Sequence, residues 1–285
     1  MIKKIIFLMI LGITIITYSE EQDNKMFTQI TSDAAVKVFE EKLDSYKQDK
    51  DGIWVWNGLY FQNMDARNLS FKVIDKYYAV DSSTVFYKGF RVSKMDPQTF
   101  EVIKYSYSKD KNEIVYGMIT VKGADMSTFK VLGKYYASDT KNIYYCSTIF
   151  SVEDASSFSV LDGIYAKDSK NIYAKGKIMK IADYQTFKTL SENYSKDKNN
   201  IYYRDEIMKV VNPSTFEVIN KAYSKDNENV YVYGKILKGA DPKTFIKGYT
   251  ENSGMDEKNL YVDGKKADEI EYFLNMQYEK YWLEI

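Results

Sequence analysis

Carboxylates and tyrosines recur at fixed intervals along the chain and could carry out chemistry. An Asp-x-x-Asn pattern returns every 29 residues, and carboxylate and amide oxygens are ligands that Ca²⁺ prefers. A calcium site needs several converging oxygens, whereas each pattern supplies one Asp and one Asn. Asp also accepts hydrogen bonds from nearby backbone amides, and Asn tolerates positive φ. We therefore interpret these residues as structural turns and not as metal ligands: Asp81, Asp110, Asp139, Asp168, Asp197, Asp226, Asn142, Asn171, Asn200 and Asn229.

The tyrosines, 27 of 285 residues, could offer stacked rings to a sugar, since each ring is flat and apolar with a polar tip. Neighbouring side chains of a strand point to opposite faces, so Ile201 and Tyr203 share one face and Tyr202 occupies the other. The aliphatic position recurs in every repeat, and its face is expected to be core. Most rings are expected to pack there too, with either the Tyr202 row or the Tyr203 row partly exposed. The candidate aromatic binding row consists of Tyr87, Tyr116, Tyr145 and Tyr203.

Several common catalytic arrangements are excluded by composition. The chain has no His, which excludes a His general base, a His-activated nucleophile and a His metal site. Cys146 is the single Cys, so it could link two chains or react as a thiol, although a tolerated lone Cys is the favoured interpretation. Ser106–Lys109 and Ser138–Lys141 have the Ser-x-x-Lys spacing of serine acyl-transferring enzymes but lack their Ser-Asp-Asn and Lys-Thr-Gly partners. No catalytic residue, metal site or cofactor is predicted.

A 29-residue repeat positions all these side chains. Each copy has two short runs rich in Tyr and aliphatic residues around the Asp-x-x-Asn turn, a second reversal such as Gly234-Lys235, and a turn ending in Phe. Three or four short strands cannot bury their own apolar face, so stacking on neighbouring copies must complete the core. The Phe row is expected to form the structural spine: Phe71, Phe100, Phe129, Phe158, Phe187, Phe216 and Phe245.

The sequence predicts an all-β repeat array of stacked short hairpins, solenoid-like and with a helical cap at each end. The alternative is a closed β-propeller-like ring, but atypical ends and the short period favour an open array. A degenerate copy precedes the array, with Phe39, Tyr46, Asp49, Ile53 and Trp54 at the same offsets.

Four segments follow from this interpretation. Residues 1–19, with two Lys and an apolar run, are predicted to be a secretory signal, with an uncleaved anchor as the alternative. Residues 20–48 are expected to form a helical cap that runs into the degenerate copy. Residues 49–264 form the array, and residues 265–285 have the apolar spacing of an amphipathic helix.

The segment Asp197-Lys198-Asn199-Asn200-Ile201-Tyr202-Tyr203, with its echoes at 139–145 and 168–173, resembles the DKNYY family of bacterial exported repeat proteins. The resemblance covers roughly residues 46–262. Members are largely exported or surface proteins without an assigned activity. The resemblance therefore implies a fold and a compartment, and it transfers no catalytic residue. Glu113-Ile114-Val115 and Ala174 depart from the motif, which suggests that single aromatic residues are dispensable.

The expected function is binding or scaffolding by an exported, non-enzymatic protein in the periplasm or on the cell surface. Its partner would be an unknown envelope protein or glycan, with no membrane span after signal cleavage and an undetermined oligomeric state. Lys plus Arg equals Asp plus Glu at 40 each, which gives no indication of electrostatic binding to nucleic acid or to an anionic membrane. One alternative is a purely structural element of the envelope. The other is a carboxylate-dependent glycan hydrolase, whose acid pair should interrupt the repeat at one place; no strong interruption is seen.

Overall fold

The computed structural model describes residues 6–7, 16–17, 46–48, 54–56, 59–60, 70–248 and 250–267. These residues form β-strands, turns and one 3₁₀ helix, η1 (Ala155–Ser157). Seven consecutive copies each fold into a four-stranded antiparallel sheet in which sequence neighbours pair. The predicted all-β repeat array is therefore confirmed.

The strands of the seven sheets lie at nearly the same positions within each copy of the repeat. They are β6 (Lys72–Val73), β7 (Tyr78–Val80), β8 (Val85–Tyr87) and β9 (Phe90–Val92); β10 (Glu101–Lys104), β11 (Tyr107–Lys109), β12 (Ile114–Tyr116) and β13 (Ile119–Thr120); β14 (Lys130–Val131), β15 (Tyr136–Ser138), β16 (Ile143–Tyr145) and β17 (Thr148–Phe150); β18 (Ser159–Asp162), β19 (Tyr165–Lys167), β20 (Ile172–Ala174) and β21 (Lys177–Ile178); β22 (Lys188–Thr189), β23 (Tyr194–Lys196), β24 (Ile201–Tyr203) and β25 (Glu206–Ile207); β26 (Glu217–Val218), β27 (Tyr223–Lys225), β28 (Val230–Val232) and β29 (Lys235–Ile236); β30 (Ile246–Lys247), β31 (Ser253–Met255), β32 (Leu260–Val262) and β33 (Lys265–Ala267).

Two smaller sheets precede these seven. The pair β1 (Ile6–Phe7) and β2 (Ile16–Thr17) lies within the predicted signal segment. The degenerate copy forms a three-stranded sheet of β3 (Tyr46–Gln48), β4 (Trp54–Trp56) and β5 (Leu59–Tyr60). Tyr46 pairs with Trp56 in the same way that Tyr78 pairs with Tyr87 in the next copy. Val55 therefore lies at the position equivalent to Phe86, where the sequence predicted Trp54. The predicted register of this copy was therefore wrong by one residue, because its turn is one residue longer.

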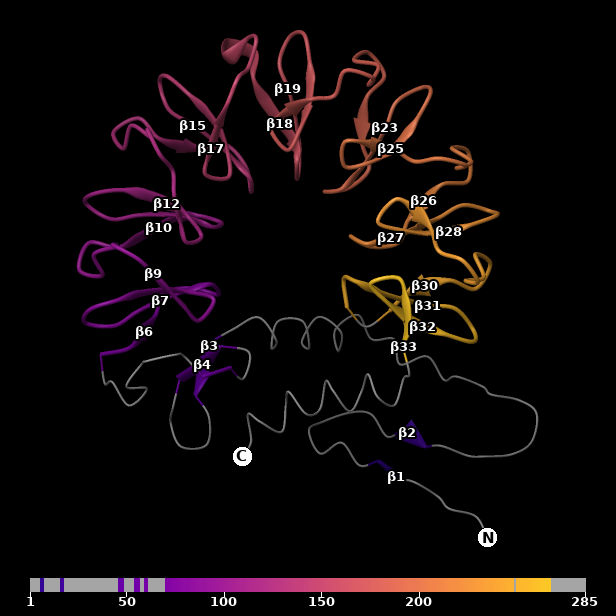
Figure 1. The fold of residues 1–285 in the computed structure, drawn as a ribbon, viewed down its shortest axis with the longest axis horizontal. Helices are drawn as coiled ribbons and strands as arrows, with labels where there is room; N and C mark the ends of the chain where they lie inside the picture. The colour runs from indigo at the N-terminus through magenta and orange to yellow at the C-terminus, as the bar shows by residue number, and fades with distance from the viewer. Residues whose placement is uncertain are drawn as a thin grey trace.

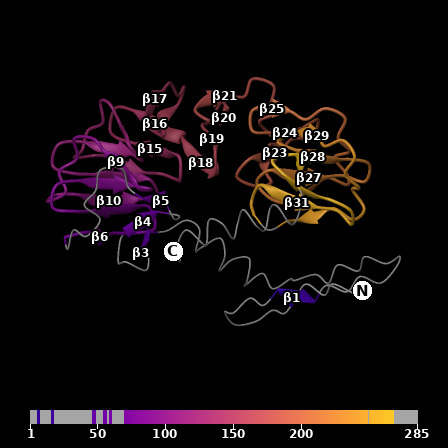
Figure 2. The same cartoon turned by 60° about the horizontal axis from the view of Figure 1, so that its bottom comes forward.

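The sheets stand side by side along an arc that runs from β3–β5 to β30–β33 (Figure 1). The linkers between sheets, including η1, lie on the outer edge of the arc. The Asp-x-x-Asn turns lie at this same edge, because Asp96 N–H of a linker donates to Asp110 of the following turn. The other two turns of each sheet meet at the inner edge, where Arg204 N–H donates to the Asn193 carbonyl. A turned view shows the same curved row with β18–β21 near its middle (Figure 2).

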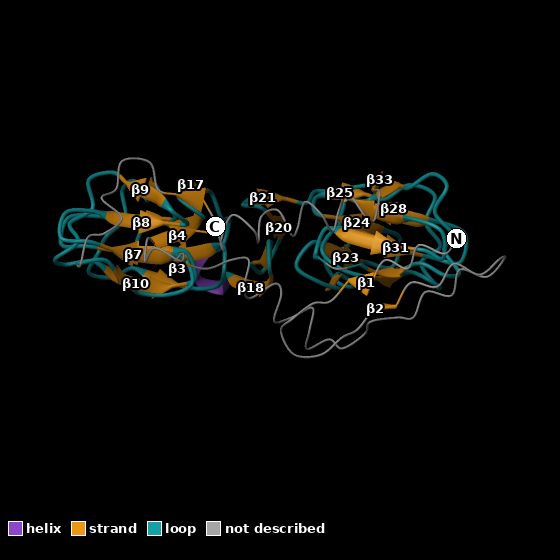
Figure 3. Cartoon of the chain, turned by 90° about the horizontal axis from the view of Figure 1, so that it is seen from below, coloured by secondary structure: helices purple, strands orange, loops and turns teal. Residues whose placement is uncertain are grey.

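Seen from below, the sheets have two distinct sides (Figure 3). Fourth strands such as β9, β17, β21 and β25 lie along one side, and first strands such as β10 and β18 lie along the other. We call these the fourth-strand side and the first-strand side. Each side exposes the outermost strand of every sheet, while the two central strands are covered by neighbouring sheets.

The core lies between consecutive sheets, so both faces of the central strands are buried. Ile201, Tyr202 and Tyr203 of β24 are all buried, although they alternate between faces. Phe187 lies between two sheets, with its ring 5.7 Å from Tyr165 and 6.3 Å from Tyr202. The other residues of the predicted Phe spine pack in the same way, with Phe71 and Phe245 buried and the rest half-buried.

Hydrogen bonds also join each sheet to the next. In five of the seven sheets, the second strand opens with a buried tyrosine whose hydroxyl donates to a carbonyl in the next sheet, as Tyr136 does to Ile164 at 2.6 Å. Tyr165 and Tyr194 repeat this contact at 2.8 and 2.9 Å. A buried hydroxyl needs such a partner, and here the partner is the inner-edge turn of the neighbouring sheet.

Helical caps are not supported. Residues 265–267 of the predicted C-terminal helix belong to β33, and the rest of that segment lies outside the described residues. The predicted N-terminal cap is described only at 46–48, which form β3. The described sheets trace an open arc and not the closed ring that was the alternative (Figure 1).

Candidate functional site

Each outer-edge turn is organised by one Asp carboxylate. In Asp197, Oδ1 accepts the backbone N–H groups of Asn199 and Asn200, both at 2.8 Å. Its Oδ2 accepts Asp183 N–H at 2.8 Å and the Tyr202 hydroxyl at 2.6 Å. The Asp therefore closes its own turn and also ties the linker to it. The other predicted turn aspartates lie in the same position in their sheets.

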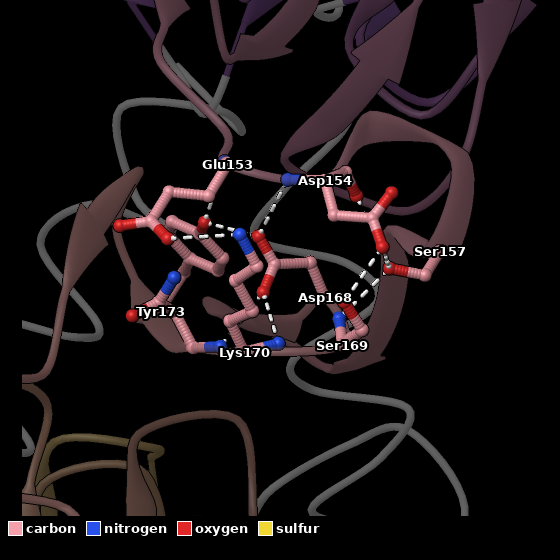
Figure 4. A network of polar contacts seen from close by, with 8 residues as sticks. Glu153, Asp154, Ser157, Asp168, Ser169, Lys170 and Tyr173 are labelled. Carbon is pink, nitrogen blue, oxygen red and sulfur yellow. Dashed lines mark hydrogen bonds and ion pairs between the residues drawn. The ribbon is translucent and has the colours of Figure 1, made fainter.

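The turn at Asp168 shows how fully these groups are used (Figure 4). Its Oδ1 accepts Lys170 N–H at 2.8 Å, and its Oδ2 accepts the Tyr173 hydroxyl at 2.6 Å and Asp154 N–H at 3.1 Å. Asp154 in turn accepts hydroxyl hydrogen bonds from Ser157 and Ser169. These contacts join the two loops that carry the carboxylates and tie them to Tyr173 of β20.

The pKa values fit this role. Burial alone would raise the pKa of Asp197, but hydrogen bonds from Asp183, Tyr202 and the turn amides outweigh burial and hold it below its ordinary value. Asp168 shows the same balance. In the described part of the chain, no group of three or more Cys, Asp or Glu side chains could hold a metal ion. The turn carboxylates are thus ionised acceptors committed to the fold.

The candidate aromatic row lies at the inner edge. Tyr87, Tyr116 and Tyr145 are half-buried and Tyr203 is buried. Each packs on the buried tyrosine directly across its strand pair, with ring centroids 4.8–5.2 Å apart. Three members of the row are thus partly exposed, as expected, whereas Tyr203 is buried because neighbouring sheets cover both faces of β24.

Glycine turns of the following sheet cover these rings. A Cβ at Gly234, which has φ +77°, would lie 2.5 Å from the Cβ of Tyr203. A Cβ at Gly176, with φ +72°, would lie 3.0 Å from the Cβ of Tyr145. Glycine is therefore needed at these turns both for the left-handed backbone and for the close approach of two sheets.

Cations lie over several inner-edge rings. Lys88 Nζ lies 4.9 Å from the centroid of Tyr77, and Lys134 Nζ lies 5.1 Å from that of Tyr135. The guanidinium carbon of Arg204 lies 5.3 Å from the Tyr203 centroid. The inner edge therefore places positive charges directly against aromatic rings.

Three sheets meet at one point of the inner edge. Lys134 Nζ and Glu192 Oε1, from sheets two apart, lie 2.5 Å from each other, and the Tyr135 hydroxyl donates to the same oxygen at 2.7 Å. Gly163 of the sheet between them has no side chain to block this contact. Hydrogen bonds from Lys134 and Tyr135 oppose the effect of burial and hold the pKa of Glu192 below its ordinary value.

This cluster is a local departure from the repeat, and it contains one carboxylate, Glu192, and not an acid pair. Its signal is visible five residues after each Phe, where Gly163 and then Glu192 follow Lys76, Tyr105 and Lys134. Alignment of the Phe positions alone did not show that curvature would bring residues 58 apart into contact.

Tyr203 is the least satisfied member of the row. Its hydroxyl is buried and has no hydrogen-bond partner in the part of the chain that the structure describes. The adjacent Arg204 has φ +58°. The residue after it, Asp205, forms an ion pair with Lys175, with 2.6 Å between Oδ1 and Nζ. The hydroxyls of Ser108, Ser191, Ser195 and Ser224 are buried without a partner among the described residues in the same way, so this feature does not single out Tyr203.

Cys146 also lies at the inner edge, directly after Tyr145. It is half-buried, its φ is +54°, and its thiol is free. Burial raises the pKa of the Cys146 thiol, which lowers the fraction of reactive thiolate near neutral pH. Ser106–Lys109 runs from the turn before β11 to the end of that strand, and Ser138–Lys141 runs from the end of β15 into the turn that follows it. Neither segment lies on a helix, as it does in acyl-transferring enzymes.

The comparisons agree with the repeat architecture. No helix in the described ranges is long and apolar enough to cross a membrane. The model of the DKNYY family matches residues 4–118, 145–206 and 205–267. No curated protein and no solved structure matches the chain. Because the family model covers most of the sequence in three successive matches, the chain belongs to the DKNYY family.

Proposed function

We propose that the protein is an exported, non-enzymatic binding module of the cell envelope, with its ligand site at the inner edge of the arc. The observation that carries the proposal is the inner-edge cluster of Lys134, Tyr135 and Glu192, where an ammonium group, a half-buried ring and a carboxylate meet. The Lys134 and Glu192 side chains are partly exposed, so a ligand with hydroxyl or carbonyl groups can exchange hydrogen bonds with them. The basic and apolar N-terminal residues support export.

A glycan fits this edge better than a small ion. Rings of Tyr135 and Tyr145, 6.0 Å apart, offer apolar surface, while Glu192 and Arg204 offer polar groups close to them in the fold. Sugars combine apolar ring faces with hydroxyl groups, so they match a site of mixed aromatic and charged side chains. The outer-edge carboxylates, in contrast, are already saturated by the fold.

Two carboxylates that each pair with a Lys provide the test. Glu192 pairs with Lys134 at the inner-edge cluster, whereas Glu153 pairs with Lys170 at the outer edge. We expect Glu192→Gln to weaken retention on purified cell-wall glycan and to lower stability by at most about 1–2 kcal/mol. Glu153→Gln should leave glycan retention unchanged, because this side chain lies away from the proposed site.

Calorimetry and a glycan pull-down on the full chain measure both effects. Equal retention of the wild type and Glu192→Gln would contradict binding at this cluster. The purely structural alternative predicts that no envelope glycan or protein is retained at all. Hydrolysis of a glycan panel that is lost in Glu192→Gln would replace the binding role with an enzymatic one.

A further inference from the structure

The fourth-strand side of the arc carries an exposed apolar row. One large apolar residue lies in the fourth strand of each of the first six four-stranded sheets, and each is 38–63% exposed. They are Phe90, Ile119, Ile149, Ile178, Ile207 and Ile236. Because these strands lie along one side (Figure 3), their side chains form a repeated row and not scattered single residues.

The same side is strongly basic. The first six fourth strands are each followed by a short segment that ends before the next Asp or Asn, such as Asp96. In the seven fourth strands and these segments together, ten side chains are Lys or Arg and two are Glu. Lysines such as Lys122, Lys177, Lys180 and Lys209 are exposed, and none of these four lies within ion-pair distance of a carboxylate among the described residues. The positive charge is therefore directed to solvent or to a partner.

The first-strand side differs in charge but not in hydrophobicity. It exposes Leu132, Leu161 and Leu190 at 37–40%. In its seven strands and the turns that follow them, eight side chains are Lys and six are Asp or Glu. An excess of positive charge thus distinguishes the fourth-strand side, although the whole chain has no net charge.

We propose that the fourth-strand side is a docking surface for a bilayer with anionic headgroups. Ile and Phe side chains on a basic surface match the interfacial region of such a bilayer, where apolar groups enter the acyl boundary and ammonium groups meet phosphates. Repetition along the arc lets many weak contacts act together. This surface contains none of the inner-edge residues, so its test is independent of the proposed glycan site.

Vesicle co-sedimentation of the full chain tests the proposal, with phosphatidylcholine vesicles that contain or lack phosphatidylglycerol. We expect binding to the anionic vesicles to exceed binding to the neutral ones and to fall with NaCl. Lys177→Glu, Lys180→Glu and Lys209→Glu together should weaken anionic-vesicle binding by about 100-fold. The matched control, Lys72→Glu with Lys130→Glu and Lys188→Glu on the first-strand side, should change binding by less than about threefold.

A second pair tests the apolar row. Ile178→Ser with Ile207→Ser should weaken binding by about tenfold, while the equally exposed pair Leu161→Ser with Leu190→Ser should not. Equal loss from both sides, or binding that ignores headgroup charge and salt, would overturn the proposal. Loss only in the Lys variants, with full competition by dextran sulfate, would assign the side to a soluble polyanion and also overturn it. Unchanged circular dichroism would show that every variant is folded.

Discussion

Replacement of Asp197 by Ala should destabilise the array locally and strongly. The carboxylate accepts four donors: the amides of Asn199, Asn200 and Asp183, and the Tyr202 hydroxyl. The exposed Asn199 amide can turn to water at little cost, whereas a buried donor that loses its partner costs about 1–3 kcal/mol. The Tyr202 hydroxyl keeps a longer contact of 3.3 Å with the Ile181 carbonyl. We expect a loss of about 3–5 kcal/mol in the stability of this sheet.

Asp110 is the matched control for this change. Its carboxylate accepts the amides of Asn112, Glu113 and Asp96, but Val115 stands where Tyr202 stands, so no phenol is involved. Asp110→Ala should therefore cost about 1–2 kcal/mol less than Asp197→Ala. The difference between the two variants isolates the contribution of the buried phenol.

Urea denaturation followed by circular dichroism gives the overall change. Hydrogen exchange at the amides of β23 and β24 localises it, which matters because repeat arrays can unfold in parts. Equal losses at Asp197 and Asp110 would refute the contribution assigned to the Tyr202 phenol. A loss below about 1 kcal/mol at Asp197 would refute the structural role of this carboxylate.

Three further predictions concern backbone strain, acid and the thiol. Gly163→Ala should lower the free energy of unfolding by about 3 kcal/mol, because φ is +50° and a Cβ would lie 2.6 Å from the backbone of Glu192. Its control is Gly239→Ala, where φ is +82° and no neighbour lies within 4 Å of the added Cβ. In urea denaturation this control should cost only about 1 kcal/mol. The turn aspartates have lower pKa values in the folded than in the unfolded protein, so they stabilise the fold fully above the unfolded pKa of about 4. This contribution is lost as pH falls below that value, and a urea midpoint that does not change between pH 5 and 3 would contradict the prediction. Cys146 should react with a thiol reagent more slowly at pH 8 than a free Cys peptide, because burial raises its pKa; an equal rate would show that the thiol is accessible and unperturbed.

The repeat period and the strand order could be predicted because both are local. Asp226 and Asn229 bound a turn whose hydrogen bonds span three residues, so spacing alone indicates it. Burial of Tyr203 could not be predicted in this way. It depends on the neighbouring sheet and its Gly234 turn, which close the second face of the sheet.

Curvature explains the other difference between prediction and structure. Sheets that narrow toward an inner edge bring Lys134 and Glu192 together across an intervening copy. A one-dimensional alignment treats each copy as equivalent and contains no information on the direction in which the row bends. The charge difference between the two sides was likewise hidden, because it emerges only when strands are assigned to sides.

The closure of every hydrogen-bond ladder within a single copy has a mechanical consequence. Strands β6–β33 pair only with sequence neighbours of the same sheet, so tension on the chain ends loads the sheets in series and can extract them one at a time. Each ruptured copy would release up to about 100 Å of extended chain, while its neighbours keep their own ladders. Under load, the protein is an extensible tether that lengthens in equal steps and refolds copy by copy when the force falls.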